Sequence, residues 1–245
     1  MFEQTKNGSF FAPQQSTQNV AVAKSFMTQV FGWMTLAMAV TAVTAYWFSS
    51  SSSMMSTLFN FETGGMTGPG WIVTLAPIGF VLLMSFGFQK LSPAVLTLLF
   101  VAFAILMGMS LSFILYVYTA ASVFKTFAVT ALMFGVMAVT GYTTKTDLTK
   151  FGSIMMMGLF GLMIAMLVNF FLKSGTMDYI ISIIGVLIFT GLTAYDVQRL
   201  KNMSNSAVAS GDGSLRKFSI LGALTLYLDF INLFIFLLRF LGDRK

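Results

Sequence analysis

Seven long apolar stretches constrain this chain more than any other feature of its sequence. A helix needs about 20 apolar residues to cross the hydrocarbon core of a bilayer. A membrane β-barrel would instead show segments of about ten residues in which apolar and polar positions alternate. The sequence therefore predicts an all-α integral membrane protein with seven transmembrane helices. The seven stretches cover residues 26–48, 70–88, 94–118, 126–144, 152–172, 179–200 and 218–241.

The composition agrees with a chain that has little soluble structure. Charged residues make up 9% of the 245 residues and apolar residues 57%, whereas soluble domains carry about 25% charged residues. Residues 1–24 are polar and are predicted to form a cytoplasmic tail, which leaves residues 25–245 as the transmembrane domain. The net charge of +6 is spread over short loops. It therefore indicates membrane topology, and we expect no nucleic-acid partner.

The positions of the basic residues predict the orientation of the chain. If the N-terminus is cytoplasmic, nine of the 14 Lys and Arg residues lie in cytoplasmic segments. The other five lie in the opposite segments, and three of these are close to the C-terminus. Because cytoplasmic loops carry the excess of Lys and Arg, we expect a cytoplasmic N-terminus and a C-terminus outside.

Histidine and cysteine are both absent, which removes several functions at once. The chain has no disulfide, thiol nucleophile or Cys/His zinc site, and no histidine base for a serine-type protease. A retinal protein needs a lysine inside a span, and here every lysine lies in a loop, a tail or at a span end. We therefore expect neither an enzyme nor a protein with a cofactor. Any proton sensing near neutral pH has to rest on carboxylates rather than on histidine.

Two aspartates lie inside predicted spans, Asp196 in the sixth and Asp229 in the seventh. A carboxylate within the bilayer costs several kcal/mol, so such residues usually face the bundle interior and mark ion pathways or proton relays. Asp196 has an alternative explanation, an ion pair with Arg199 near the inner end of its helix. Asp229 has no cation on its own helix nearer than Arg239, and we expect its neighbour Asn232 to hydrogen-bond across helices.

Counting residues does not decide whether the two aspartates meet. At about 1.5 Å per residue, Asp196 lies about 7 Å from Lys201, whereas Asp229 lies about 18 Å from Lys217. Contact requires that the seventh span begins below the membrane surface or that it is tilted. The sequence permits contact without predicting it.

Several strings of residues occur in the order that is characteristic of one family. The chain resembles the transmembrane Bax-inhibitor-motif (Bax inhibitor-1) family from Gln29 to its C-terminus, and most closely the bacterial inner-membrane, YbhL-like branch. The strongest strings are Gly191–Gln198 (GLTAYDVQ) and Leu221–Phe234 (LGALTLYLDFINLF), followed by Tyr118–Ser122, Gly141–Lys145 with Asp147 and Leu148, and Leu167–Phe170.

The resemblance implies a fold in which the last helix is central and is surrounded by the other six. In members studied as channels, it also implies a pH-dependent calcium leak. There, an aspartate of the sixth helix and one of the seventh form a hydrogen-bonded, proton-sensing pair, which by motif are Asp196 and Asp229. The family also has a basic group at the inner end of the second helix, and Lys90 is the residue that can take this role here.

We therefore expect a pH-sensitive calcium, or cation, leak channel in the bacterial inner membrane, with the bilayer and the permeant ion as its partners. Two carboxylates that share a site cannot both ionise at low cost, so one proton is expected to be shared between them. Asp196 and Asp229 would bind calcium only weakly and transiently, because this ion takes six to eight oxygen ligands.

Two other functions remain open. The alternative is an interaction protein of membrane-protein quality control, which would bind a membrane protease or translocon through residues 1–24. A proton-coupled transporter also uses carboxylates inside the membrane, but the sequence shows no inverted repeat.

Overall fold

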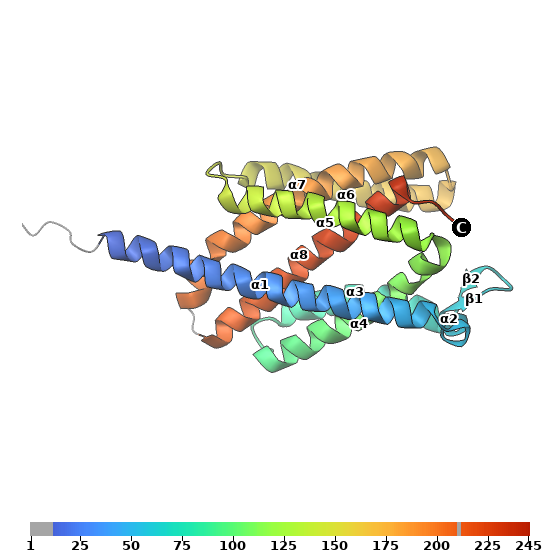
Figure 1. The fold of residues 1–245 in the computed structure, drawn as a ribbon, viewed down its shortest axis with the longest axis horizontal. Helices are drawn as coiled ribbons and strands as arrows, with labels where there is room; N and C mark the ends of the chain where they lie inside the picture. Colours follow the sequence, from blue (N-terminus) through green and yellow to red (C-terminus); the bar gives the residue numbers. More distant parts are fainter. Residues whose placement is uncertain (1–11, 210–211) are drawn as a thin grey trace, which may run out of the picture.

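The computed structural model describes residues 12–209 and 212–245, and nearly all of them are helical (Figure 1). All the helices described except α2 contain a segment that is long and apolar enough to cross a membrane, which makes seven candidate spans. The prediction of an all-α membrane protein with seven spans is confirmed. The helices are α1 (Ala12–Ser49), α2 (Ser52–Leu58), α3 (Gly68–Gly87), α4 (Pro93–Val117), α5 (Ala120–Thr143), α6 (Thr149–Leu172), α7 (Gly175–Ala209) and α8 (Asp212–Leu241).

Hydroxyl side chains cap the N-terminal ends of several spans. Thr67, Ser92 and Thr119 precede α3, α4 and α5, and each hydroxyl accepts a hydrogen bond from a backbone N–H of the first helical turn. The first N–H groups of a helix have no partner within the helix, so these caps satisfy groups that would otherwise be unpaired. Pro93 supports the start of α4, because its fixed φ suits the first helical position.

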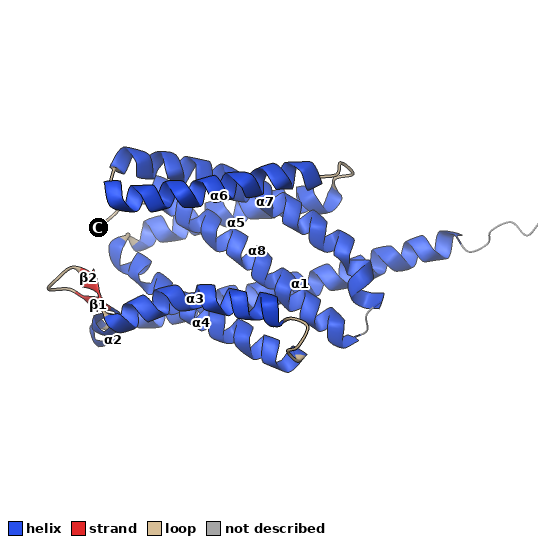
Figure 2. Ribbon diagram, turned by 180° about the vertical axis from the view of Figure 1, so that it is seen from behind, coloured by secondary structure: helices blue, strands red, loops and turns tan. Residues whose placement is uncertain are grey.

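The first span belongs to a longer helix than the sequence predicted. Helix α1 begins at Ala12, inside the segment assigned to the polar tail, and its apolar part begins at Ala23. The connection to α3 also has structure of its own. It contains α2 and a short antiparallel hairpin, in which β1 (Phe59–Asn60) pairs with β2 (Gly65–Met66) (Figure 2).

Helix α8 forms the centre of the bundle and crosses it obliquely (Figures 1 and 2). In its most apolar stretch 72% of the residues are buried, compared with 61% in α7 and 11–33% in the other spans. A helix that is apolar on all sides and also buried is expected at the middle of a bundle. The start of α1 and the C-terminus lie toward opposite ends of the bundle, as an odd number of spans requires.

The arrangement around α8 differs in one respect from the resemblance. Helix α8 packs against α1, α3, α4, α5 and α7, whereas α6 packs chiefly against α7. The reason is the short connection between α6 and α7, where Lys173 adopts the left-handed conformation that ends many helices. This turn brings α7 back along α6, so that α7 separates α6 from most of the core and shares the central position with α8.

Candidate functional site

Asp196 and Asp229 are brought together on the facing sides of α7 and α8. Both residues are buried, with 7% and 5% of their surface exposed, and their carboxyl groups lie close enough to share a proton. An ionised carboxylate can only accept hydrogen bonds, so a hydrogen bond between them would require a proton on one of the two groups. We refer to the two residues as the aspartate pair.

The lengths of the two helices explain why the pair forms. Helix α7 continues to Ala209 and α8 begins at Asp212, so both helices extend past the basic residues from which depth was counted. Asp196 then lies about 20 Å from the end of α7 and Asp229 about 26 Å from the start of α8, at about 1.5 Å per residue. The oblique course of α8 reduces the remaining difference in depth.

Two glycines allow α5 and α6 to approach α7 next to the pair. A Cβ atom at Gly141 would collide with the carbonyl oxygen of Ala194, and one at Gly152 would collide with the ring of Tyr195. Both contacts involve residues directly before Asp196. Small residues at helix interfaces let backbones approach closely within a membrane, and here they fix α7 beside its neighbours.

The charges around the pair are sparse. Arg199 Nη1 lies 4.0 Å from Asp196 Oδ1, but the Arg199 side chain is 59% exposed. An exposed pair at this distance contributes little, because water screens it. Asp229 Oδ2 is buried and has no hydrogen-bond partner among the described residues. A buried carboxyl oxygen without a donor is costly, so the pair has unused capacity to bind a proton, a water molecule or a cation.

Two hollows border the pair. The first, which we call the α3 cavity, has a volume of about 300 Å³, lies between α3, α7 and α8, and is lined by Ser85 and Asp196 among others. The second, the α6 cavity, has a volume of about 730 Å³ and lies between α6, α7 and α8. Asp196 lines both cavities and Asp229 lines the α6 cavity. The pair therefore lies where the two cavities adjoin.

Each cavity has an arginine at an end. Arg199 lines both cavities and lies toward the end of the bundle at which α1 begins. Arg239 lines the α6 cavity at the opposite end, where its Nη1 lies 3.5 Å from Asp178 Oδ1 at the start of α7. The α6 cavity thus extends from the neighbourhood of the pair to an ion pair near the C-terminal end.

The supporting residues predicted from the sequence have different positions. Asn232 lines the α6 cavity, but its Nδ2 donates to Leu228 O of its own helix, so the expected bond across helices is not formed. Lys90 is exposed in the turn after α3 and lines neither cavity. A second basic residue reaches that end of α3, Lys217 of α8, whose Nζ lies 3.3 Å from the carbonyl oxygen of Phe88. Sequence reasoning missed Lys217 because no local pattern links it to α3.

A second set of residues missed by sequence reasoning holds the α5–α6 loop against α7. Gln198 Oε1 accepts from Leu148 N, and Gln198 Nε2 donates to Thr146 O, both at 2.8 Å. Lys201 Nζ donates to Tyr142 O at 2.7 Å. These bonds join the string Gly141–Leu148 to the string that contains Asp196. The sequence analysis identified both strings as part of the family pattern. It did not predict that they lie next to each other.

The site offers few oxygen ligands for a resident metal. In the ranges that the structure describes, no group of three or more Asp, Glu, His or Cys side chains is close enough to hold an ion. The side-chain oxygens that line the α6 cavity come from the two carboxyl groups, Tyr195, Thr225 and Asn232. Calcium takes six to eight oxygen ligands, so a cation at this position would keep water molecules in its shell.

The fold and the buried pair define the class of the protein, a polytopic helical membrane protein with ionisable residues in its interior. Comparison with known sequences defines the family. Residues 23–245 match the family model described as inhibitor of apoptosis-promoting Bax1, and the chain belongs to this family. The resemblance inferred from the sequence strings is confirmed.

Similar proteins occur in several bacteria. The chain is 48% identical to the inner membrane protein YbhL of Escherichia coli strain K12, over 91% of this chain and 93% of that protein. It is 41% identical to an uncharacterized protein of Borreliella burgdorferi, over 94% of this chain and 97% of that protein. It is also 41% identical to the uncharacterized protein RP147 of Rickettsia prowazekii, over 91% of each chain.

Proposed function

We propose that this protein is a pH-sensitive leak pathway for calcium or other cations, gated by a proton shared between Asp196 and Asp229. The observation that carries the proposal is a pair of buried, neighbouring carboxyl groups at the junction of two cavities. Ionisable residues inside a membrane usually serve such pathways. The similarity to the inner membrane protein YbhL supports the bacterial inner membrane as its location.

The shared proton couples pH to the contact between α7 and α8. With one proton, the pair holds one hydrogen bond and one negative charge. Loss of this proton places two negative charges in contact, which repel one another and favour separation of the helices. Gain of a second proton removes the charge that attracts a cation. The two ionisations belong to the pair rather than to either residue.

The proposed path follows the two cavities. A cation would enter near the Asp178–Arg239 ion pair, cross the α6 cavity, pass the aspartate pair and leave through the α3 cavity beside Arg199. Two carboxylates with water as additional ligand bind calcium weakly, which suits passage rather than storage. In this proposal the protein acts without a cofactor and catalyses no reaction.

The decisive experiment measures calcium flux into liposomes that contain the purified protein, at a series of pH values. Asp196→Asn and Asp229→Asn preserve shape and hydrogen bonding but cannot titrate, so each variant is expected to lose most of the pH dependence. The double variant should lose no more than either single variant, because both remove the same coupled site. Asp147→Asn is the matched control, an exposed carboxylate in the α5–α6 loop.

A wild-type pH profile in both single variants would contradict the proposal. The two carboxylates would then be structural. The interaction-protein hypothesis, with a membrane protease or translocon as partner, would become the preferred one.

A further inference from the structure

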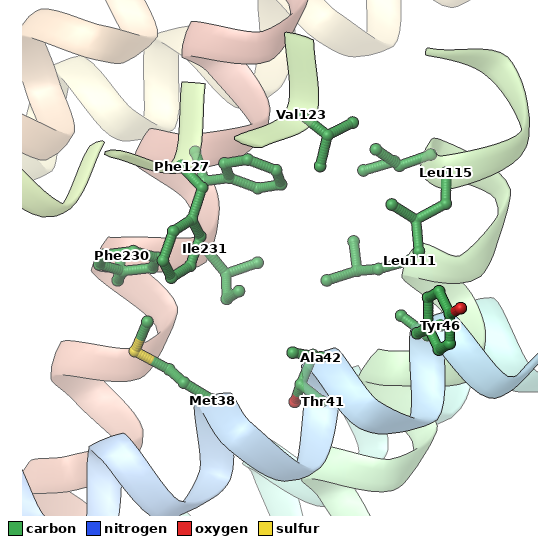
Figure 3. A pocket seen from close by; sticks show the side chains of 13 residues that line it. Met38, Thr41, Ala42, Tyr46, Leu111, Leu115, Val123, Phe127, Phe230 and Ile231 are labelled. Carbon is green, nitrogen blue, oxygen red and sulfur yellow. The ribbon is translucent and has the colours of Figure 1, made fainter. Parts of the chain in front are cut away.

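A lateral groove of about 250 Å³ lies on a different face of α8 from the aspartate pair (Figure 3). Its walls come from α1, α4 and α5, and its floor comes from Phe230, Ile231 and Phe234 of α8. Successive residues of an α-helix are about 100° apart, so these three residues face away from Asn232 and Arg239 of the α6 cavity. The groove is therefore separate from the proposed ion path.

The groove opens sideways, toward the lipid. Its floor residues on α8 are buried, as are Thr41 and Ala45 of α1. Its rim is exposed, and includes Ala42 and Tyr46 of α1 and Phe127 of α5. In a bundle that spans a bilayer, exposed apolar side chains on the outer surface contact acyl chains. The mouth of the groove is thus continuous with the lipid-facing surface.

The interior of the groove offers a ligand almost no polar group. The Thr41 hydroxyl already donates to Ala104 O at 2.9 Å, and it is bonded to the Tyr227 hydroxyl at 2.7 Å. The Tyr46 hydroxyl points away from the hollow (Figure 3). Apolar cavities stay dry and take up hydrocarbons, and an engineered cavity of about 150 Å³ binds benzene. A larger groove of this kind is suited to a longer hydrocarbon.

The position of the groove along the bundle indicates where the hydrocarbon comes from. Tyr46 and Trp47 are exposed near the end of α1, on the side of the C-terminus, and aromatic residues of this type mark the membrane–water interface. From Tyr46 the groove extends along α1 to Met38, eight residues away or about 12 Å. It therefore runs from the headgroup level toward the middle of the bilayer.

We propose that the lateral groove binds one acyl chain of a phospholipid from the leaflet nearer the C-terminus. The chain inserts between α1–α4 on one side and α5 on the other, and it covers the apolar face of α8. It completes the packing of the central helix at the place where protein side chains leave a hollow. This site does not depend on ion conduction.

The test uses the full chain in vesicles of phosphatidylethanolamine and phosphatidylglycerol. The vesicles contain a small amount of phosphatidylcholine with a photoreactive diazirine midway along one acyl chain. After illumination, labelled residues are mapped by mass spectrometry. We expect labels on Ile231 and Phe234, which are buried on α8 and which an acyl chain reaches through the groove. Absence of label on these residues, with normal labelling of the lipid-facing Leu132, would overturn the proposal.

A pair of variants tests whether the groove is the route. Ala42→Phe fills the groove from its rim and should reduce labelling of α8 severalfold, with Leu132 unchanged. Val43→Phe adds the same ring at a neighbouring, 69% exposed position that does not line the groove, and it should have no effect. An equal loss in both variants, or no loss in either, contradicts the proposal. If Ala42→Phe lowers the unfolding temperature strongly, the milder Ala42→Leu replaces it.

Discussion

At the scale of single residues, the aspartate pair shows how few groups the site uses. Asp196 has a distant and exposed partner in Arg199, and Asp229 Oδ2 has none among the described residues. A buried salt bridge would neutralise the charge permanently. In the proposed function the charge is compensated chiefly by a shared proton, so the state of the site would depend on the proton concentration around the protein.

Asp147 provides a contrast outside the membrane. Its Oδ1 accepts hydrogen bonds from the hydroxyl and the backbone N–H of Thr149, at 2.6 and 2.9 Å, and these bonds lower the pKa of its carboxyl group below 3.8. A carboxyl group whose pKa is lower in the folded state than in the unfolded state stabilises the fold at pH values above its unfolded-state pKa. This stabilisation is lost as the pH falls through the folded-state pKa. At neutral pH Asp147 stays ionised in both states.

We therefore predict that Asp147→Asn leaves the flux–pH profile unchanged near neutral pH. Wild type and Asp147→Asn can differ in thermal stability because only the wild type carries a charge at this position. The part of this difference that is due to the charge should become smaller once the pH falls below 3.8. A flux profile displaced at neutral pH would show that Asp147 senses protons.

At the scale of elements, two polar contacts hold helices together near the middle and at one end of the bundle. The first is the amide of Gln198, which pairs with the backbone of the α5–α6 loop through both of its polar atoms. The second is the hydroxyl of Thr41, which joins α1 to Ala104 of α4 and to Tyr227 of α8. Each contact brings together segments that are far apart in the sequence.

Gln198→Ala should destabilise the protein. The change removes two part-buried hydrogen bonds, to Leu148 N and to Thr146 O, each worth about 0.5–1.5 kcal/mol. Gln198→Glu keeps an acceptor for Leu148 N but loses the donor, so we expect an intermediate effect. The measurement is the thermal unfolding of purified protein, with Asn202→Ala on the exposed side of the same helix as control. Equal unfolding temperatures for Gln198→Ala and the control would contradict this prediction.

Thr41→Val should cost more stability than Tyr227→Phe. Valine leaves the buried Tyr227 hydroxyl without a partner, whereas phenylalanine removes that hydroxyl and leaves the Thr41 bond to Ala104 O in place. We expect about 1–3 kcal/mol for Thr41→Val and about 1 kcal/mol for Tyr227→Phe. The double variant should be less destabilised than the sum of the two, because they share one interaction. Strict additivity in unfolding measurements would show that the two hydroxyls act independently.

At the scale of the whole molecule, seven candidate spans predict that the two termini lie on opposite sides of the membrane. From the distribution of basic residues we predict that the N-terminal side faces the cytoplasm. In this orientation the hairpin of β1 and β2 and the C-terminus face outward, and the α5–α6 loop faces the cytoplasm.

This orientation is tested with single cysteines, since the natural chain has none. In intact cells, a membrane-impermeant maleimide should label Glu62→Cys in the hairpin and should not label Lys145→Cys in the α5–α6 loop. Permeabilised cells, in which both variants should react, provide the control. The reverse pattern in intact cells would place the C-terminus in the cytoplasm.

The sequence determined the number and approximate positions of the spans and the helical class. These features are local, because a bilayer requires about 20 apolar residues per helix and all backbone groups paired within it. The sequence also indicated the two aspartates, because a charge inside an apolar stretch is conspicuous. It did not determine that they meet, since this depends on how far α7 and α8 extend and on the course of α8.

Only the tertiary structure decided which side chains surround the pair. It brought Lys217 of α8 next to Phe88 at the end of α3, and it joined Gln198 to a loop 50 residues earlier in the chain. It also left a groove where α4 and α5 meet α1 and α8, which are distant from them in the sequence. Such contacts arise from the relative depth, rotation and tilt of packed helices. Hydrophobic length sets none of these quantities, because each depends on the side chains of several helices at once.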